Sequence, residues 1–242
     1  QVGIGDPTHG AWDEGADFVG ALQASGLELS GTMIGFPGED YTSPATIRET
    51  GGFGDPALRA GRLEIFRYAV DKTAELGLQC LCSHAGFIPE EDGPERSSFL
   101  DCIAEAAQYA GDKDVLFTME TGQETAALLR RTLDELKLPS LRVNFDPANM
   151  ILYDMGDPIE AIEILGPDIA HVHAKDANPP QTNGEWGEEV PLGDGSVGMA
   201  AFAEALAKAG YRGPLVVERE VGDQAERIAA IKHGISVLRE LT

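Results

Sequence analysis

The sequence predicts a (β/α)₈ barrel, and two observations carry that prediction. Strand-like and helix-like segments alternate along all 242 residues without a break in composition, and this alternation calls for a parallel sheet with helical crossovers. Four of the strand-like segments end in an acidic residue or a histidine, where barrel enzymes keep their active residues. A doubly wound sheet is the other parallel architecture, but it needs a glycine-rich turn that residues 3–8 match poorly.

Seven segments have strand-like patterns, and they cover residues 2–5, 27–36, 78–83, 115–119, 141–146, 169–173 and 214–217. Segments with helical spacing follow them, over residues 14–25, 57–76, 94–110, 123–136, 158–165, 197–209 and 224–241. Two long loops remain, 37–55 and 178–196. A closed barrel of this class has eight strands, so we expect a single domain over residues 1–242 that lacks its first βα unit in this chain. The alternative is one short strand that the pattern does not reveal.

The composition limits the partners. The formal net charge is −23, from 18 Lys and Arg against 41 Asp and Glu, and such a surface repels nucleic-acid backbones and anionic membranes. No apolar run approaches the roughly 18 residues of a transmembrane helix. The cysteines, Cys80, Cys82 and Cys102, lack the spacing of a disulfide framework. They indicate free thiols of a reducing compartment, and we therefore expect a cytoplasmic protein.

The clearest of the four strand ends lies in residues 141–149. Val143 and Phe145 alternate with polar residues, which is the period of a strand. Pro147 ends the pairing because it has no N–H to donate, and Asp146 therefore stands at the last strand position. The residues that close the four strands are Glu120, Asp146, His173 and Glu218.

Three carboxylates brought together at one barrel mouth repel one another, and their burial without partners is costly. A divalent cation removes that conflict. Carboxylates with one imidazole suit Mn²⁺, Mg²⁺ or Co²⁺, and Zn²⁺ also accepts these ligands. The four strand ends therefore predict a site for one divalent metal ion.

Through these motifs the chain resembles the xylose isomerase-like TIM barrels, the sugar phosphate isomerase/epimerase superfamily. The resemblance runs from about residue 27 to the C-terminus. It rests on Met-Glu-Thr-Gly-Gln-Glu at 119–124, Asn-Phe-Asp-Pro-Ala-Asn at 144–149, His-Val-His-Ala-Lys-Asp at 171–176, Pro-Leu-Gly-Asp-Gly at 191–195 and Val-Glu-Arg-Glu at 217–220.

The resemblance implies one metal held by Glu120, Asp146, His173 and Glu218, with the two glutamates doubling as acid and base. It also implies that a strand and a helix precede the segment matching residues 2–5. The superfamily includes endonuclease IV, a three-zinc enzyme acting on abasic DNA. That branch has a histidine where this chain has Asn149, so one metal and a small substrate are expected here, although His84 matches one of its zinc ligands.

The predicted substrate-binding residues are His84, Asn149, Lys175, Arg219, Trp12 and Trp186. His84 either bonds a substrate hydroxyl or packs at the rim. Lys175 and Arg219 either bind a carbonyl or phosphate oxygen or form surface ion pairs. The two tryptophans either stack on a sugar face or pack their own loops.

The predicted activity is isomerisation or epimerisation of a keto sugar through an enediolate. One glutamate removes the proton α to the carbonyl and the other returns it, while the metal acts as a Lewis acid. The alternative is a metal-dependent dehydratase or lyase that expels a β-substituent from a keto sugar or a 3-keto-glycoside. A non-catalytic sugar-binding barrel is a third hypothesis, although a binder needs no acid–base pair. The sequence leaves open the sugar, the metal and whether the chain forms a homo-oligomer.

Overall fold

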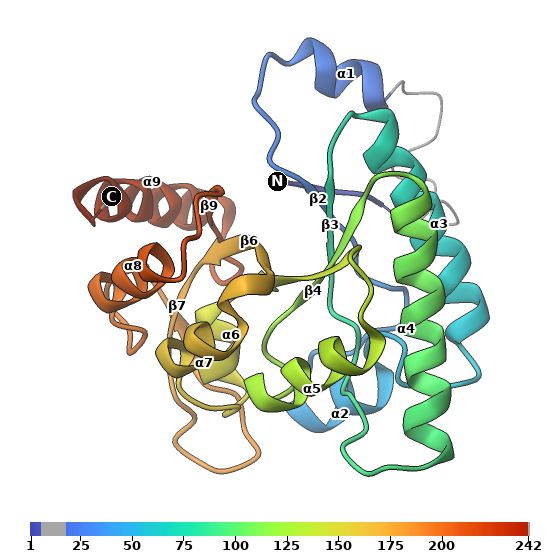
Figure 1. The fold of residues 1–242 in the computed structure, drawn as a ribbon. Helices are drawn as coiled ribbons and strands as arrows, with labels where there is room; N and C mark the ends of the chain where they lie inside the picture. The colour runs from blue at the N-terminus through green and yellow to red at the C-terminus, as the bar shows by residue number, and fades with distance from the viewer. Residues whose placement is uncertain (6–17, 242) are drawn as a thin grey trace. The chain divides into compact units, whose positions relative to one another are not determined.

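The computed structural model describes residues 1–5 and 18–241 (Figure 1). The chain divides into two compact units. The first consists of residues 1–41, 46–119 and 132–142, and the second of residues 42–45, 120–131 and 143–242.

The strands of the first unit are parallel neighbours in chain order. They are β1 (Val2–Gly3), β2 (Thr32–Met33), β3 (Cys80–Ser83) and β4 (Leu116–Glu120), the last residue of which belongs to the second unit. The helices that begin in this unit are α1 (Phe18–Ala24), α3 (Arg59–Glu75) and α4 (Pro94–Asp112). Short βα units with parallel strands are the arrangement that the alternating pattern predicts.

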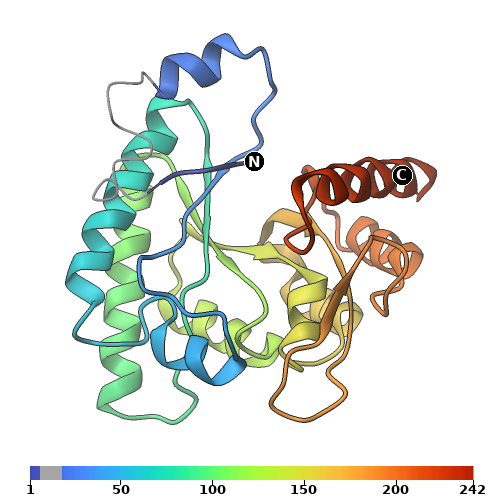
Figure 2. The same cartoon turned by 180° about the vertical axis from the view of Figure 1, so that it is seen from behind.

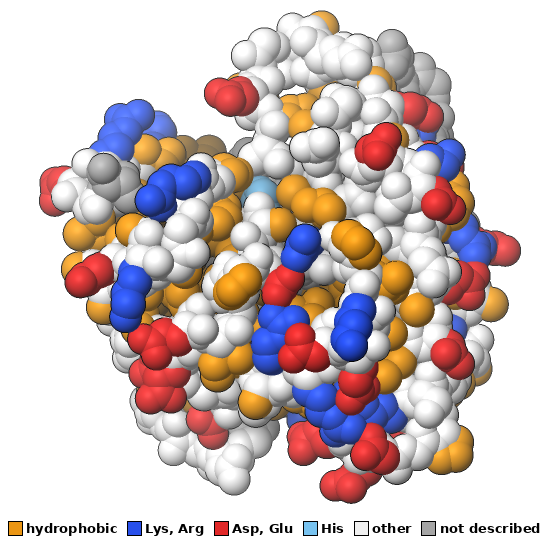
Figure 3. Space-filling model, viewed as in Figure 1, with side chains coloured by type: hydrophobic (Ala, Val, Ile, Leu, Met, Phe, Trp, Pro, Cys, Tyr) orange, Lys and Arg blue, Asp and Glu red, His pale blue; other side chains and the backbone are white. Residues whose placement is uncertain are grey.

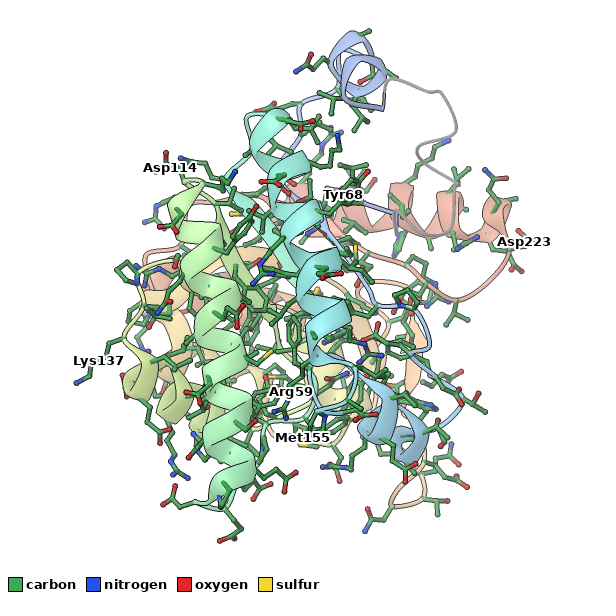
Figure 4. The ribbon with its side chains drawn as sticks, turned by 90° about the vertical axis from the view of Figure 1, so that its right-hand side faces the viewer. Arg59, Tyr68, Asp114, Lys137, Met155 and Asp223 are labelled. Carbon is green, nitrogen blue, oxygen red and sulfur yellow. The ribbon has the colours of Figure 1, made fainter. Side chains whose placement is uncertain are left out.

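Helices α3 and α4 run side by side in the same direction, from the end near Arg59 to the end near Asp114 (Figure 4). The buried ring of Phe66 on α3 packs on Phe117 of β4, with ring centroids 4.6 Å apart, and on Phe53 at 6.2 Å. Burial of such rings supplies much of the stability of a helix packed on a sheet.

The second unit contains the parallel strands β5 (Leu141–Phe145), the first two residues of which belong to the first unit, β6 (Ile169–Ala174) and β9 (Leu215–Val217), in that order. Strand β6 pairs with β5 through His171↔Asn144 and with β9 through His173↔Val216. The helices of this unit and its margins are α5 (Ala126–Leu136), α6 (Pro147–Leu152), α7 (Pro158–Leu165), the 3₁₀ turn η2 (Gly166–Asp168), α8 (Met199–Lys208) and α9 (Gln224–Leu241).

Helix starts in the second unit follow from local capping. Asp157 accepts backbone N–H bonds of 2.7 Å and 3.1 Å at the start of α7. Asp223, labelled in Figure 4, caps α9 by accepting backbone N–H bonds from its first turn. The Asp223 N–H in turn donates to the Glu226 carboxylate at 2.8 Å. Such reciprocal capping satisfies donors that a helix start otherwise leaves unpaired.

Each of the seven parallel strands in the described part of the chain overlaps one of the seven predicted segments, although β1 and β2 are only two residues long. The absence of a first βα unit and the single domain stay predictions. No helix among the described residues is long and apolar enough to cross a membrane. The three cysteines are free thiols, as expected.

Both predicted loops contain secondary structure. Helix α2 (Pro44–Thr50) forms within 37–55, and β8 (Glu188–Val190) forms within the second loop, where it pairs with β7 (Asp176–Asn178), at the start of that loop, as an antiparallel hairpin (Figure 2). The prediction of an irregular segment over 178–196 was therefore wrong in part. Strands of three residues rich in Asp, Asn and Glu have no strand-like pattern of their own, and here tertiary hydrogen bonds fix them.

The end of the second unit is more exposed than its middle. Helix α9 buries only Gly234 and Leu238 among its described residues, and Ile228 and Ile235 are 45% and 39% exposed. Hydrophobic side chains accordingly reach the surface over α8 and α9, with Lys and Arg side chains among them (Figure 3).

Candidate metal centre

The second unit brings together the four residues predicted to bind a metal. Glu120 ends β4, Asp146 directly follows β5, His173 is the last residue but one of β6 and Glu218 directly follows β9. One potential ligand atom of each lies within 4.8 Å of those of the other three. The carboxyl ends of parallel strands meet at one edge of a sheet, which is why residues far apart in the sequence converge here.

The Nδ1 atom of His173 lies at the middle of this cluster. Its distances are 2.9 Å to Oε1 of Glu120, 3.3 Å to Oε2 of Glu218 and 3.8 Å to Oδ2 of Asp146. The His173 and Asp146 side chains are fully buried, whereas that of Glu218 is 17% exposed. The cluster is thus closed on the side of β5 and β6 and open toward β9.

Asp146 is held by its backbone and by one of its carboxylate oxygens. Its Oδ1 accepts the Asn149 N–H at 2.9 Å, which caps α6. Its N–H donates to the Thr121 hydroxyl at 2.8 Å, and that hydroxyl donates to its carbonyl at 2.9 Å. The orientation of the carboxylate is therefore set before any ligand arrives.

The other oxygen of Asp146, Oδ2, is buried and has no hydrogen-bond partner among the described residues. Its nearest cationic groups, His173 Nδ1 and Lys175 Nζ, are both 3.8 Å away. A buried carboxylate oxygen without a partner is costly. Together with the carboxylates of Glu120 and Glu218 and the imidazole of His173, this oxygen forms a donor set that fits a divalent ion.

The charges of the cluster are strongly coupled. Burial raises the pKa of Asp146, against the opposing effects of Lys175 and His173. Burial alone would lower the pKa of His173, but Glu120 and hydrogen bonds to the carboxylates hold it well above its usual range. A nearby positive charge therefore stabilises the clustered carboxylates, and a bound divalent ion would supply such a charge.

Two of the predicted substrate-binding residues, Asn149 and Lys175, lie inside the cluster. The Lys175 side chain is 1% exposed, and its Nζ donates to Oδ1 of Asn149 and to Oε2 of Glu218, each at 3.2 Å, and to Glu220. Asn149 in turn donates to Oε1 of Glu120 at 3.2 Å. Lys175 is therefore a buried counter-charge of the carboxylates, although its partner Glu220 is itself exposed.

Arg219 does form an ion pair, but with a buried partner: its Nη1 donates to Oε1 of Glu189 at 2.9 Å. Trp186 packs edge-on against Tyr153, with ring centroids 4.7 Å apart. His84 belongs to the first unit, directly after β3, and Trp12 lies outside the described residues. Substrate binding by these residues stays a prediction.

Several further residues surround the cluster; of these, the sequence indicated His171, which shares the face of its strand with His173, and did not indicate Tyr153, Gln123 or Glu124. Tyr153 accepts a bond from Gln123 Nε2 at 3.4 Å, and its pKa is raised by burial. Burial and the charge of Glu120 raise the pKa of Glu124 to about 8. His171 pairs with Asn144 at 2.7 Å, and burial and the nearby His173 lower its pKa to about 4. Gln123 and Glu124 belong to the motif at 119–124, which was the available signal for them.

The family model for the xylose isomerase-like TIM barrel matches residues 5–241. The chain belongs to this family. The predicted fold class is thereby confirmed, and the match extends over both compact units.

Among solved structures, the chain is similar to a xylose isomerase domain protein from Planctomyces limnophilus. The two are 33% identical with a TM-score of 0.94, over 100% of this chain and 87% of the other. The 3-keto-D-glucoside 4-epimerase YcjR of E. coli has a TM-score of 0.67 at 19% identity, over 92% of this chain and 83% of the other. At that identity the likeness shows the fold alone.

Among curated proteins, the chain is 28% identical to the L-ribulose-5-phosphate 3-epimerase UlaE of Escherichia coli K12 over 173 residues. The match covers 69% of this chain and 59% of that relative. The chain thus spans less than two thirds of the length of the curated relatives it matches.

Proposed function

We propose that this chain is a divalent-metal-dependent epimerase or isomerase of a keto sugar. The observation that carries the proposal is the convergence of Glu120, Asp146, His173 and Glu218 around the unpartnered oxygen of Asp146. The family membership and the name of its curated relative, an L-ribulose-5-phosphate 3-epimerase, support the same class of reaction.

The four residues would hold one Mn²⁺, Mg²⁺ or Co²⁺ ion, with Zn²⁺ as a further candidate. When bound, the ion would act as a Lewis acid on the oxygen of the substrate carbonyl. Its identity, and the sugar, are matters for experiment. A cytoplasmic location and assembly into a homo-oligomer stay predictions.

Glu120 and Glu218 are the acid–base pair of the proposal. They come from different strands and approach His173 Nδ1 separately, at 2.9 Å and 3.3 Å. Hydrogen bonds and charge from His173 and Lys175 hold the pKa of Glu218 below its usual range despite its burial, so this carboxylate is ionised and able to accept a proton. Asn149 and His173 donate to Glu120 Oε1 and fix its carboxylate.

Two carboxylates on two strands can act on two positions of one substrate. One removes the proton α to the carbonyl, and the other returns a proton. Return to the opposite face of the same carbon gives an epimer, whereas return to the neighbouring carbon gives the aldose–ketose isomer. The buried ammonium of Lys175 lies beside Glu218 and so places a positive charge next to one of the two carboxylates that transfer the proton.

The test is a screen of keto sugars and 3-keto-glycosides in D₂O with Mn²⁺, Mg²⁺ or Co²⁺ added. An epimerase or isomerase incorporates deuterium from solvent into both the substrate and the product. A dehydratase or lyase instead yields an eliminated product without deuterium exchange in the product pool. Sugar binding without deuterium in either pool would indicate a non-catalytic barrel and would contradict the proposal.

A further inference from the structure

Glu189, on the hairpin strand β8, is a buried acid that the proposed reaction does not use. It stands opposite Ala177 of β7. Its Oε1 accepts two bonds, from Arg219 Nη1 at 2.9 Å and from the Glu220 N–H at 3.0 Å. Both donors belong to the two residues that directly follow Glu218, so one buried carboxylate holds the backbone and a side chain of this segment.

The segment 218–220 is also tied to the end of β6. The Glu218 N–H donates to the carbonyl of Ala174 at 3.1 Å, and Lys175 Nζ donates to the carboxylates of both Glu218 and Glu220. The segment is therefore held between Lys175 on one side and Glu189 on the other. Its three side chains alternate between these two partners.

Strand β9 gives Glu218 little support of its own. It has three residues, all half-buried, and it pairs with β6. By contrast, residues 143–145 of β5 are buried and lead directly to Asp146. Residues 171–174 of β6 are also buried, and they include His173. The position of Glu218 thus depends on contacts made after the strand has ended.

The hairpin that carries Glu189 is itself firmly anchored. The buried carboxylate of Asp176 accepts the N–H groups of Gly193, Gly195 and Val197 at 3.0 Å, 3.1 Å and 3.1 Å. A Cβ at Gly195 would lie 2.2 Å from Asp176 Oδ1, so only glycine fits there. At the other end of β8, the Gly187 N–H donates to the carbonyl of Leu152 at 3.2 Å.

We propose that the β7–β8 hairpin positions Glu218 for metal binding and proton transfer, and that Glu189 is the positioning residue. The inference rests on the proposed function, because it assigns Glu218 to the metal and the substrate. Groups that orient a metal ligand typically cost 10- to 100-fold in metal affinity or activity when they are removed. A hairpin that is anchored at both ends is rigid, and a ligand is held in a fixed orientation only by rigid neighbours.

The experiment compares Glu189→Ala, Glu189→Gln and Glu188→Ala with the unchanged protein. Glu188 is the adjacent, exposed acid of β8 and so matches the loss of charge without the contacts. We expect Glu189→Ala to weaken Mn²⁺ binding, measured by calorimetry, by about 10- to 100-fold. Glu189→Gln keeps a carbonyl oxygen for the Glu220 N–H and should recover part of that loss. Glu188→Ala should bind Mn²⁺ like the unchanged protein.

Turnover separates positioning from general damage. Because Glu189 acts only through the segment 218–220, saturating Mn²⁺ should restore most of the kcat of Glu189→Ala, while half-activation requires about 10- to 100-fold more Mn²⁺. Hydrogen exchange at the Glu220 amide should accelerate in Glu189→Ala at a temperature where thermal unfolding shows the variant to be folded. A variant that fails to fold is replaced in this comparison by Glu189→Gln.

The outcomes distinguish the two proposals. If the unchanged protein binds no divalent ion, the proposed function fails and the positioning role fails with it. If it binds Mn²⁺ and Glu189→Ala binds equally well, or if Glu188→Ala loses as much affinity, the positioning role alone is overturned. An unchanged exchange rate at Glu220 in a folded Glu189→Ala variant would overturn it as well.

Discussion

The two sides of the second unit place their ligands by different means. In the β5–β6 region, residues 143–174, Asp146 and His173 are fully buried; the helix cap and Thr121 fix Asp146, and His173 lies within strand β6. In the β9–α9 region, residues 215–241, the strand is half-buried and Glu218 is 17% exposed. Packing thus fixes one side of the centre, and charge pairs fix the other.

This difference makes the two sides respond differently to the same kind of change. Loss of a ligand on the packed side removes a donor from a rigid frame and leaves the frame in place. Loss of a charge on the paired side moves the donor itself, because Lys175 holds Glu218 directly and Glu189 holds the two residues that follow it. The variants below test this contrast, beginning with the largest expected effect.

On the packed side, Asp146→Asn and His173→Ala should each abolish metal uptake. Asp146→Asn keeps an oxygen at Oδ1 to cap α6, so the fold should persist while the charged donor Oδ2 is lost. Elemental analysis after mild metal loading should find about one ion per unchanged chain, as this ligand set implies, and essentially none per variant. Asp157→Asn makes the same chemical change at the cap of α7 and serves as the control. Full occupancy in both ligand variants would refute the ligand assignment.

Glu120→Gln and Glu218→Gln compare, through catalysis, the glutamate that ends β4 with the glutamate of the paired side. Each keeps an oxygen ligand but loses the carboxylate base, so turnover should fall by at least about 10²-fold while some metal remains bound. Each variant should also lose deuterium exchange preferentially from the one epimer that it deprotonates. Measurement of exchange from each epimer in D₂O checks this, and an identical loss from both epimers in both variants would contradict two separate bases.

Lys175→Met tests whether charge holds the paired side. The change removes the buried ammonium that pairs with Glu218 and Glu220, and breaking a buried ion pair costs about 3–5 kcal/mol. The decrease in the free energy of unfolding should be large in EDTA and smaller with Mn²⁺, because the bound ion replaces part of the missing positive charge. Urea unfolding in both conditions measures it, with Lys208→Met as the control because Lys208 is 79% exposed. Equal destabilisation with and without Mn²⁺ would show that Lys175 contributes packing only.

The contrast between the two sides also explains what the sequence predicted. Asp146 and His173 follow strong strand patterns, and the geometry of parallel strands makes such ends converge. Glu120 and Glu218 were found for the same reason. Lys175 lies one residue after β6 and beside the cluster, but its buried contacts with Glu218 and Glu220 are ones that no local pattern reveals.

The hairpin and its contacts could not be predicted in this way. Strands β7 and β8 have three residues each, and the bonds that fix them join Asp176 to the backbone of residues 193–197 and Glu189 to residues 219–220. These bonds span 17 to 31 residues along the chain. Periodicity reports which side of an element is buried and carries no information about such pairings.

Glu124 offers the smallest of the expected effects and probes the electrostatics beside Glu120. Its side chain is buried, and burial and the charge of Glu120 raise its pKa to about 8, against 4.5 for the ordinary group. Between these two pH values the folded chain binds a proton that the unfolded chain does not. The free energy of unfolding therefore falls as the pH rises from about 4.5 through 8.

Glu124→Gln removes the titrating carboxyl group, so the variant should lack this dependence of the free energy of unfolding on pH. At 1.36 kcal/mol per pKa unit, the unchanged protein should lose on the order of 3 kcal/mol relative to the variant between pH 5 and pH 8. Urea unfolding of both proteins in EDTA measures the difference, and Glu185→Gln, at an exposed position, provides the control. Because both proteins contain the same other titratable groups, the difference isolates Glu124. Parallel stability curves would mean that Glu124 is ionised at neutral pH, and the second unit would then contain one more buried negative charge beside Glu120 for a metal ion to balance.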